Sequence, residues 1–224
     1  MSYTAVIVEP RKHAAMPLVV KNFLTHLPAT EWNILVMHGK SNKTFVEEKV
    51  LVMDPLRIRL YELPSCENLT IRDYNCLLSS PEFYEIIPTE IMLIFQTDTL
   101  IVNPCRLCEI IRDFEERYDY VGAPWKDGAV GNGGLSLRKK SKMLERIARN
   151  PRYPDWLNED IYFSQDPFLK KPDAETASIF STETVFNEES FGIHKAWDYI
   201  TKEEFEKLVD RCPDVRTLRD LNDR

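Results

Sequence analysis

Asp98 follows residues 91–95, a run of five apolar residues, after the short polar step Gln96 and Thr97. A short apolar run bounded by polar residues predicts a strand that is buried on both faces. Open α/β sheets place their ligands at the carboxyl ends of such strands. Mg²⁺ and Mn²⁺ prefer oxygen ligands, and one or two carboxylates suffice where phosphates supply the rest. Asp98 therefore stands where a carboxylate can do chemistry, and together with the glycine cluster that follows it in the chain it is our candidate ligand for a divalent cation. By itself such an Asp can equally be a turn or helix-cap residue.

Glycine is concentrated in one segment downstream of this strand. Five of the seven glycines in the chain lie within thirteen positions: Gly122, Gly128, Gly131, Gly133 and Gly134. Glycine lets a backbone turn tightly or approach a neighbour closely. Such a cluster indicates a binding site more readily than an ordinary loop.

Residues 95–101 (Phe-Gln-Thr-Asp-Thr-Leu-Ile) resemble the metal-binding segment of GT-A glycosyltransferases, which use nucleotide-sugar donors and end a buried strand with Asp-x-Asp. Gln96 occupies the first Asp position and Asp98 the second, and a neutral amide binds a divalent cation more weakly than a carboxylate. The chain also resembles a poorly characterised glycosyltransferase-like domain family of large DNA viruses, fungi and bacteria. That likeness runs from residues 8–11 (Val-Glu-Pro-Arg) to 194–197 (His-Lys-Ala-Trp).

The resemblance implies one GT-A-like domain over residues 1–224, of α/β class, with a Rossmann-like, open and mostly parallel sheet flanked by helices. It implies an enzyme that moves a sugar from a nucleoside-diphosphate sugar, by default a UDP-sugar, to a hydroxyl of a glycan or protein acceptor. Inversion of the anomeric configuration is expected. A Mn²⁺ or Mg²⁺ ion on the two phosphates would act as a Lewis acid for the leaving group.

A second metal ligand is expected late in the chain. Some GT-A families supply a histidine beside a Lys-x-Trp segment, and residues 194–197 are similar, which makes His194 the candidate. An imidazole suits Mn²⁺ better than Mg²⁺, although a lone histidine is as often structural. Lys195 could meet the diphosphate as a point charge.

Glu159 and Asp160 resemble the acidic pair that inverting GT-A enzymes carry after their glycine segment. A carboxylate at that place takes the proton of the acceptor hydroxyl. The matching position makes Asp160 the expected base and leaves Glu159 as the alternative. Partial burial and a neighbouring carboxylate should raise the pKa of this base. Both acids could instead simply favour the dipole of a first helical turn.

Further contacts to the donor are expected from several segments: Arg11, Tyr74, Gln96, Thr97, Gly133 and Gly134. The guanidinium of Arg11 suits phosphate or base edges, and backbone N–H groups at Gly133 and Gly134 suit phosphate or sugar. Trp125 offers an apolar platform on which a sugar could stack. Solvent exposure for Arg11, core packing for Tyr74 and a core anchor for Trp125 are the structural alternatives.

The apolar patterns of the chain predict the elements that hold these residues. Strands are expected at 4–8, 32–37, 58–63, 91–95, 120–123 and 134–138, and within 174–186. Helices are expected at 17–27, 44–49, within 70–87, at 106–118, from a cap at Ser141 to 149, from about 156, and over a charged tail at 201–221 that breaks at 212–213. Prolines should break the chain at 151–154, and residues 191–197 should form a loop.

Composition excludes several classes of protein. A net charge of −7 disfavours a nucleic-acid or anionic-membrane surface. No apolar run approaches the roughly 20 residues that span a bilayer, and no signal peptide is evident. Five scattered cysteines indicate free thiols in a reducing compartment, so we expect a cytoplasmic protein, in the host cytoplasm if the source is a virus. Cys105 and Cys108 have redox spacing, but the start of a helix explains them better.

Two other functions remain open from the sequence. A degenerate GT-A domain could bind a nucleotide or a glycan without turnover, as Gln96 would suggest. A nucleotidyltransferase shares a similar fold but typically carries a basic, glycine-rich loop after its first strand. Residues 8–13 contain no glycine, which counts against that class.

Overall fold

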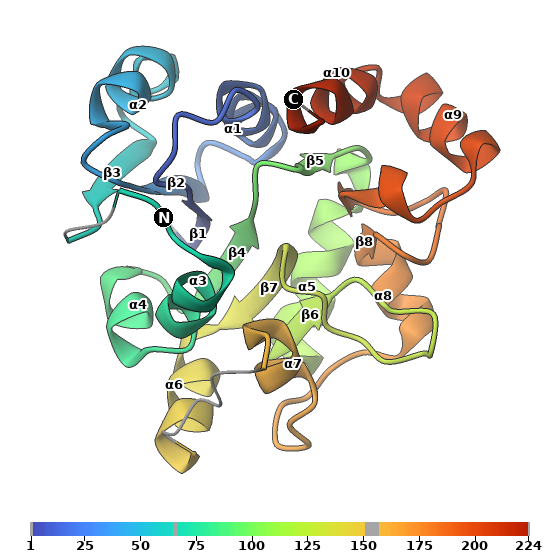
Figure 1. The fold of residues 1–224 in the computed structure, drawn as a ribbon. Coiled ribbons are helices and arrows are strands. Elements are labelled where there is room, and N and C mark those ends of the chain that lie inside the picture. The colour runs from blue at the N-terminus through green and yellow to red at the C-terminus, as the bar shows by residue number, and fades with distance from the viewer. Residues whose placement is uncertain (1, 65–66, 151–156, 224) are drawn as a thin grey trace.

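The computed structural model describes residues 2–64, 67–150 and 157–223 (Figure 1). Its main sheet contains β1 (Tyr3–Val8), β2 (Trp32–His38), β3 (Ile58–Glu62), β4 (Ile91–Phe95), β6 (Tyr120–Gly122) and β7 (Leu135–Lys139). The strand order is β3-β2-β1-β4-β7-β6. The first four strands in the chain run parallel, whereas β7 is antiparallel to both of its neighbours. The predicted open, mostly parallel α/β sheet is confirmed.

The middle of the sheet is buried on both faces. In β1, Ala5 and Ile7 join the core cluster on one face, whereas Val6 and Val8 join the cluster on the other. The same alternation divides β4. A strand covered on both faces needs apolar side chains at every position, which explains why the apolar run at 91–95 was a reliable signal.

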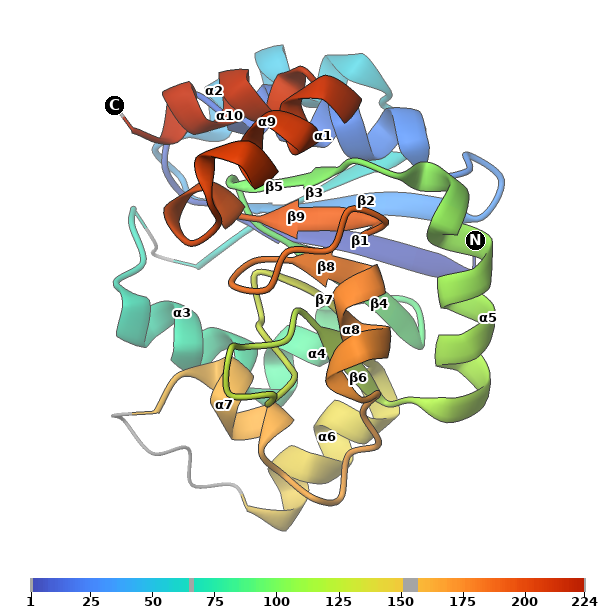
Figure 2. The ribbon, with the colours of Figure 1, turned by 90° about the vertical axis from the view of Figure 1, so that its right-hand side faces the viewer.

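Helices cover both faces, as Figures 1 and 2 show. One core cluster is closed by α1 (Met16–His26), α2 (Lys43–Lys49), α5 (Leu107–Arg117), α8 (Ala174–Phe180), α9 (Lys202–Arg211) and α10 (Asp214–Asn222). The opposite cluster is closed by α3 (Ile71–Leu78), α4 (Pro81–Ile86), α6 (Lys140–Arg149) and α7 (Glu159–Ser164). Short 3-10 turns are η1 (Leu51–Met53), η2 (Pro104–Arg106) and η3 (Ala196–Asp198). Across the described ranges, no helix has the length and apolar character to cross a membrane.

A second, smaller sheet was not expected. It contains β5 (Thr99–Ile101), β9 (Gly192–His194) and β8 (Ser181–Thr182), in the order β5-β9-β8. The prediction of a loop at 191–197 was therefore wrong, and residues 174–186 contain the expected strand only after helix α8. Three-residue strands carry no readable alternation, and β9 is a strand because it pairs with β8 and with β5, about ninety positions earlier in the chain.

Helix boundaries differ from the prediction at one cap. Ser141 does not cap α6, which begins at Lys140; its hydroxyl instead donates a hydrogen bond to Glu90 Oε1 at 2.6 Å. Residues 70–87 form two helices, because Thr70 caps α3 and Ser80 caps α4. The predicted break at 151–154 and the helix start near 156 lie outside the described residues, and α7 begins at Glu159. Cys105 and Cys108 are free, exposed thiols in η2 and α5.

Candidate active site

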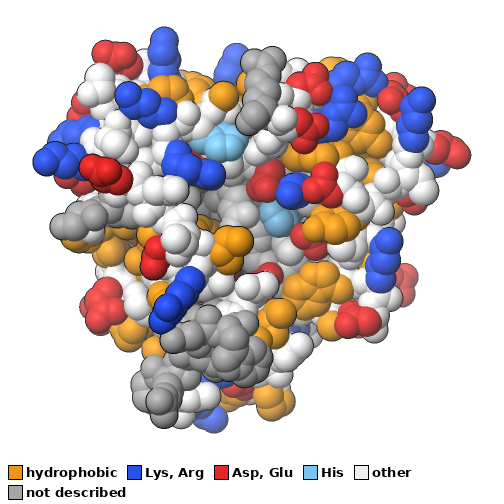
Figure 3. Space-filling view, in the orientation of Figure 1, with side chains coloured by type: hydrophobic (Ala, Val, Ile, Leu, Met, Phe, Trp, Pro, Cys, Tyr) orange, Lys and Arg blue, Asp and Glu red, His pale blue; other side chains and the backbone are white. Residues whose placement is uncertain are grey.

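A cavity of about 600 Å³ opens at the carboxyl ends of β1 and β4. Figure 3 shows a hollow near the middle of this face, with acidic, basic and histidine side chains gathered around it. Every predicted site residue except Trp125 lines this cavity: Arg11, Tyr74, Gln96, Thr97, Asp98, Gly133, Gly134, Glu159, Asp160, His194 and Lys195. The fold thus brings together residues that are up to 184 positions apart (11 to 195).

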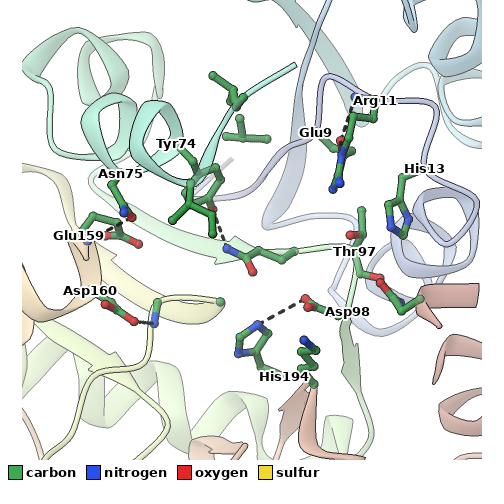
Figure 4. Close-up of a pocket in the computed structure, with 18 of the residues that line it drawn as sticks. Glu9, Arg11, His13, Tyr74, Asn75, Thr97, Asp98, Glu159, Asp160 and His194 are labelled. Carbon is green, nitrogen blue, oxygen red and sulfur yellow. Dashed lines mark hydrogen bonds and ion pairs between the residues drawn. The ribbon is translucent and has the colours of Figure 1, made fainter. Parts of the chain in front are cut away.

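Asp98 and His194 face each other across the small sheet (Figure 4). His194 Nε2 lies 3.4 Å from Asp98 Oδ1, and β5 pairs with β9 so that Thr99 lies opposite His194. Burial lowers the pKa of His194, but the charges of Asp98 and Glu183 outweigh burial and raise it to about 10. Burial is the largest influence on Asp98 and raises its pKa, but the charge and contact of His194, together with the charge of Lys195, outweigh burial and keep this pKa below its usual value. Without a cation the two side chains therefore form a charged pair.

Lys195 lies beside this pair in a left-handed backbone conformation, with φ of 45°. Its N–H donates to the carbonyl of Asp98 at 2.9 Å, which fixes the two segments to each other. Its ammonium lies 3.0 Å from Asp198, and this hydrogen bond raises the pKa of Lys195. The cation is half-exposed at the cavity rim, where an anionic ligand could compete for it.

Gly133 and Gly134 leave room for side chains of the site. A Cβ on Gly134 would stand 2.2 Å from the His194 ring, and one on Gly133 would stand 2.5 Å from Glu159 Oε1. The two N–H groups are already used, because Gly133 donates to Asp160 Oδ2 at 3.3 Å and Gly134 donates to Asn132 Oδ1 at 3.0 Å. In this structure the glycines therefore let the site side chains pack closely. The expected contact with the donor stays a prediction.

Glu159 is held by a buried arginine. Arg138 donates two hydrogen bonds to its carboxylate, Nη1 to Oε2 at 2.9 Å and Nη2 to Oε1 at 3.1 Å. The Arg138 side chain is fully buried and that of Glu159 is 4% exposed. Ser136 and Tyr84 accept further bonds from the guanidinium. Glu159 thus neutralises a buried cation, which makes it a less available base than its neighbour.

Asp160 has the environment of a base. Its Oδ1 accepts a hydrogen bond from the N–H of Ile161 at 2.7 Å, and its Oδ2 accepts from Gly133. Burial and the charge of Glu159 raise the pKa of Asp160 to about 6. The predicted direction of this shift agrees with the structure, and its catalytic role stays a prediction.

The ion pair predicts a large stability effect. We expect Glu159→Gln to destabilise the protein by about 3–5 kcal/mol, because it leaves the Arg138 guanidinium buried without a counter-charge. Urea unfolding measures this change. Glu145→Gln is the matched control, since Glu145 pairs with Lys142 and Arg149 at the surface and should change stability by less than about 1 kcal/mol. Equal effects of the two substitutions would contradict the prediction.

Tyr74 and Gln96 form one wall of the cavity. Gln96 Nε2 donates to the Tyr74 hydroxyl at 3.0 Å, and burial raises the pKa of Tyr74. Asn75, the next residue of α3, accepts a hydrogen bond from the N–H of Glu159 at 3.3 Å. Thr97 contributes its carbonyl to Asn222 in α10 at 3.1 Å. The amide of Gln96 is thus engaged by protein, which leaves Asp98 as the carboxylate of this strand end.

Arg11 lies on the opposite wall, in the loop after β1. Its Nε and Nη2 donate to the Glu9 carboxylate at 2.8 and 2.7 Å, so Glu9 fixes a guanidinium that is 56% exposed. The hydrogen bond with Glu9 raises the pKa of Arg11. His13 also lines this wall, and burial lowers its pKa.

Trp125 lies away from the cavity lining. Its backbone N–H donates to Ala129 at 2.8 Å and its carbonyl accepts from Gly128 at 3.0 Å, within a turn bounded by Pro124 and Val130. The indole is half-buried. Sugar stacking on Trp125 stays a prediction.

The sequence did not single out several residues that complete the site: Glu9, His13, Asn75, Asn132, Arg138 and Glu183. Glu9 and His13 lie in the same loop as Arg11, so proximity to Arg11 was an available signal. Arg138 is the only charged residue in the apolar part of β7, which could have indicated a buried partner. For Glu183, no local signal exists.

The charge of the lining bears on what can bind. Its acidic members are Glu9, Asp98, Glu159, Asp160, Asp198 and Asp223, and its cationic members are Arg11, Lys195 and His194, whose pKa is raised to about 10. A diphosphate would therefore need an added cation. Asp98 Oδ1 is buried and accepts no hydrogen bond from the described residues, and a carboxylate beside an imidazole suits Mn²⁺. Within those same ranges no three His, Cys, Asp or Glu side chains are grouped to hold a metal, so phosphate oxygens would have to supply the other ligands.

The sequence model of one protein family matches residues 57–194, which are more than half of the 224 residues. Its description is "Protein of unknown function (DUF5672)". The chain belongs to the DUF5672 family. The match ends at His194 and includes every predicted site residue except Arg11 and Lys195. No curated protein matches the sequence.

Comparison with solved structures shows the fold class of this DUF5672 protein. TarS of S. aureus superposes with a TM-score of 0.56 at 11% identity, over 99% of this chain and 42% of TarS. A mannosyltransferase of Pyrobaculum calidifontis, solved with GDP-Man and Mn²⁺, gives 0.55 at 12% identity over 75% of this chain and 53% of that one. TarS residues 1–349 with UDP-GlcNAc give 0.53 at 11% identity, over 99% and 70%. The chain thus spans less than half of the longer TarS chain and has the fold of GT-A glycosyltransferases.

Proposed function

We propose that this DUF5672 protein is a metal-dependent glycosyltransferase that moves a sugar from a nucleoside-diphosphate sugar to an acceptor hydroxyl. The observation that carries the proposal is one cavity with two chemically distinct ends. The Asp98–His194 pair suits a cation on a diphosphate, and Asp160 is a carboxylate whose pKa is raised to about 6. Neighbours of the same fold were solved with GDP-Man and Mn²⁺ or with UDP-GlcNAc, which supports this ligand class.

Asp98 and His194 would hold Mn²⁺ or Mg²⁺, which neutralises the leaving diphosphate as a Lewis acid. Lys195 would add a point charge to the same phosphates, and Arg11 would meet the nucleotide from the opposite wall. Asp160 would accept the proton of the acceptor hydroxyl at Oδ1 or Oδ2 as that oxygen attacks the anomeric carbon. Attack from the face opposite the diphosphate inverts the configuration. Our default donor is a UDP-sugar, and our expected acceptor is a glycan or a protein, handled by a single domain in the cytoplasm.

A thermal-shift screen tests the proposal. UDP, GDP, UDP-glucose, UDP-GlcNAc and GDP-mannose are each added with Mn²⁺, with Mg²⁺ or with EDTA. A ligand present at about 100 times its Kd stabilises the native state by about 2.7 kcal/mol and raises the melting temperature. We expect at least one diphosphate to do so only with a metal, whereas the corresponding monophosphate has a smaller effect. If no nucleotide raises the melting temperature with either Mn²⁺ or Mg²⁺, the proposal is wrong.

A binding module without turnover is the second candidate, and the state of Gln96 favours it. Its amide donates to Tyr74 and stands where GT-A enzymes carry a carboxylate. Release of the nucleoside diphosphate distinguishes the two candidates once a donor is known. An enzyme releases it when an acceptor is added, or slowly when water replaces the acceptor, whereas a binding module leaves the donor intact.

A further inference from the structure

Glu183 stands directly behind the candidate metal ligand His194. It follows β8, its side chain is 7% exposed, and its Oε1 lies 3.2 Å from His194 Nδ1. Glu183 does not line the cavity, whereas His194 does. The two ring nitrogens thus face different carboxylates: Nε2 faces Asp98 in the cavity and Nδ1 faces Glu183 in the interior. Glu183 therefore reaches the cavity through the imidazole of His194 and through Asn132, which also lines it.

A chain of hydrogen bonds extends from Glu183 to the glycine segment. Asn132 Nδ2 donates to Glu183 Oε1 at 2.8 Å, and Asn132 Oδ1 accepts from the N–H of Gly134 at 3.0 Å. The His194 ring occupies the space where a side chain at position 134 would lie. Glu183 behind the ring and Gly134 against its face therefore fix the same imidazole.

The carboxylate is poorly satisfied for a buried group. Glu183 Oε2 is buried and has no hydrogen-bond partner among the described residues. A buried oxygen without a hydrogen-bond partner lowers the stability of the fold. Proteins typically accept such unsatisfied polar groups at functional sites. Packing alone would be served equally well by an apolar side chain of the same size.

We propose that Glu183 is a positioning residue that orients His194 for the cation. The inference rests on the proposed function, because it takes His194 as a metal ligand. His194 Nδ1 lies 3.2 Å from Glu183 Oε1 as an ion pair, without a hydrogen bond of regular geometry to any described residue. A carboxylate beside Nδ1 favours the ring proton on that nitrogen, which leaves Nε2 free to bind a metal and makes Nε2 more basic. Partners of this kind are typically worth about 10- to 100-fold in metal affinity.

The test titrates Mn²⁺ into wild type, Glu183→Gln and Thr184→Val, with and without UDP, and follows free Mn²⁺ by electron paramagnetic resonance. Thr184→Val is the matched control, because Thr184 adjoins Glu183 but donates to the carbonyl of Pro124. We expect Glu183→Gln to weaken Mn²⁺ binding by about 10- to 100-fold and Thr184→Val to leave it within about twofold. Spin-echo spectra should show ¹⁴N coupling to Mn²⁺ in wild type, a weaker coupling in Glu183→Gln, and none in His194→Ala.

The outcomes separate this inference from the function on which it rests. If wild type binds no Mn²⁺ in either condition, the metal site of the proposed function is wrong, and the inference is wrong with it. If wild type binds Mn²⁺ and Glu183→Gln binds it equally well with the same ¹⁴N coupling, only the inference fails. If Glu183→Gln does not fold, Glu183→Asp takes its place, since it keeps the charge but shortens the reach to Nδ1; unchanged Mn²⁺ affinity in that variant would also refute the inference.

Discussion

Asp98→Asn is expected to remove nearly all metal-dependent nucleotide binding and turnover. The substitution keeps the shape of the side chain and removes the one carboxylate at the end of β4. Asp98 Oδ1 is buried without a hydrogen-bond partner in the described part of the chain, and Gln96 beside it is neutral. Lewis-acid stabilisation of a leaving group is worth several kcal/mol, so a loss of at least about 10²-fold in kcat/KM is expected.

Two measurements check this result. Calorimetry with the best nucleotide of the thermal-shift screen should show Mn²⁺-dependent binding in wild type and little in Asp98→Asn. Asp113→Asn is the control, because Asp113 pairs with Arg117 on the surface of α5, and it should behave as wild type. Mn²⁺-stimulated turnover near the wild-type level in Asp98→Asn would show that the metal site is elsewhere.

The sheet could be predicted from the sequence wherever burial on both faces left a continuous apolar run. β1, β2 and β4 are of this kind, and the polar step after β4 located the cavity. The small sheet could not be predicted in this way. β9 has three residues and lies between β5 and β8 in the small sheet, and β5 comes about ninety positions earlier in the chain, beyond the reach of a local pattern. His194 was nevertheless placed correctly in the cavity by its resemblance to a late GT-A histidine, which uses no local structure.

The residues behind His194 could not be predicted from local sequence patterns, because they come from distant parts of the chain. Glu183 and Asn132 have ordinary neighbours in the sequence, and only the tertiary fold brings them behind His194. Part of the glycine cluster lies at the cavity, as the sequence indicated, and its expected contact with the donor stays a prediction. Gly134 accommodates the imidazole and Gly133 accommodates Glu159, and a sequence alone does not show whether a missing Cβ makes room for a ligand or for a side chain.

Asp160→Asn is expected to lower kcat by about 10²–10⁴-fold while leaving donor affinity almost unchanged. A positioned general base typically accelerates a reaction by this factor. The loss is expected because Asp160 is the group that we propose takes the proton of the acceptor hydroxyl. Glu159 is the alternative, but its carboxylate is held by Arg138. Glu159→Gln should therefore lose stability first, and activity only in proportion to the protein that remains folded.

The pH dependence follows from the raised pKa of Asp160, which is about 6. The base acts in its deprotonated form, so kcat/KM should fall about tenfold per pH unit below pH 6 and level off above it. Asp160→Asn should lose this acidic limb. The same shift bears on stability: the folded protein binds this proton more tightly than the unfolded chain, so ionisation of Asp160 destabilises the fold at neutral pH. A shift of about two pKa units corresponds to an upper limit of about 3 kcal/mol. Asn accepts the hydrogen bonds from Gly133 and Ile161 more weakly, so we expect Asp160→Asn to be more stable than wild type by about 1–2 kcal/mol at pH 7–8.

Loss of rate together with a gain in stability separates a catalytic Asp160 from a structural one, because damage to the fold would lower both. Proton NMR of the first product formed gives the stereochemistry. Inversion is required, since a retaining transfer needs no base at this place. A retained configuration, or an Asp160→Asn variant that keeps wild-type kcat and the acidic limb, would remove Asp160 from the mechanism. An inverting enzyme whose acidic limb vanishes only in a folded Glu159→Gln variant would assign the base to Glu159.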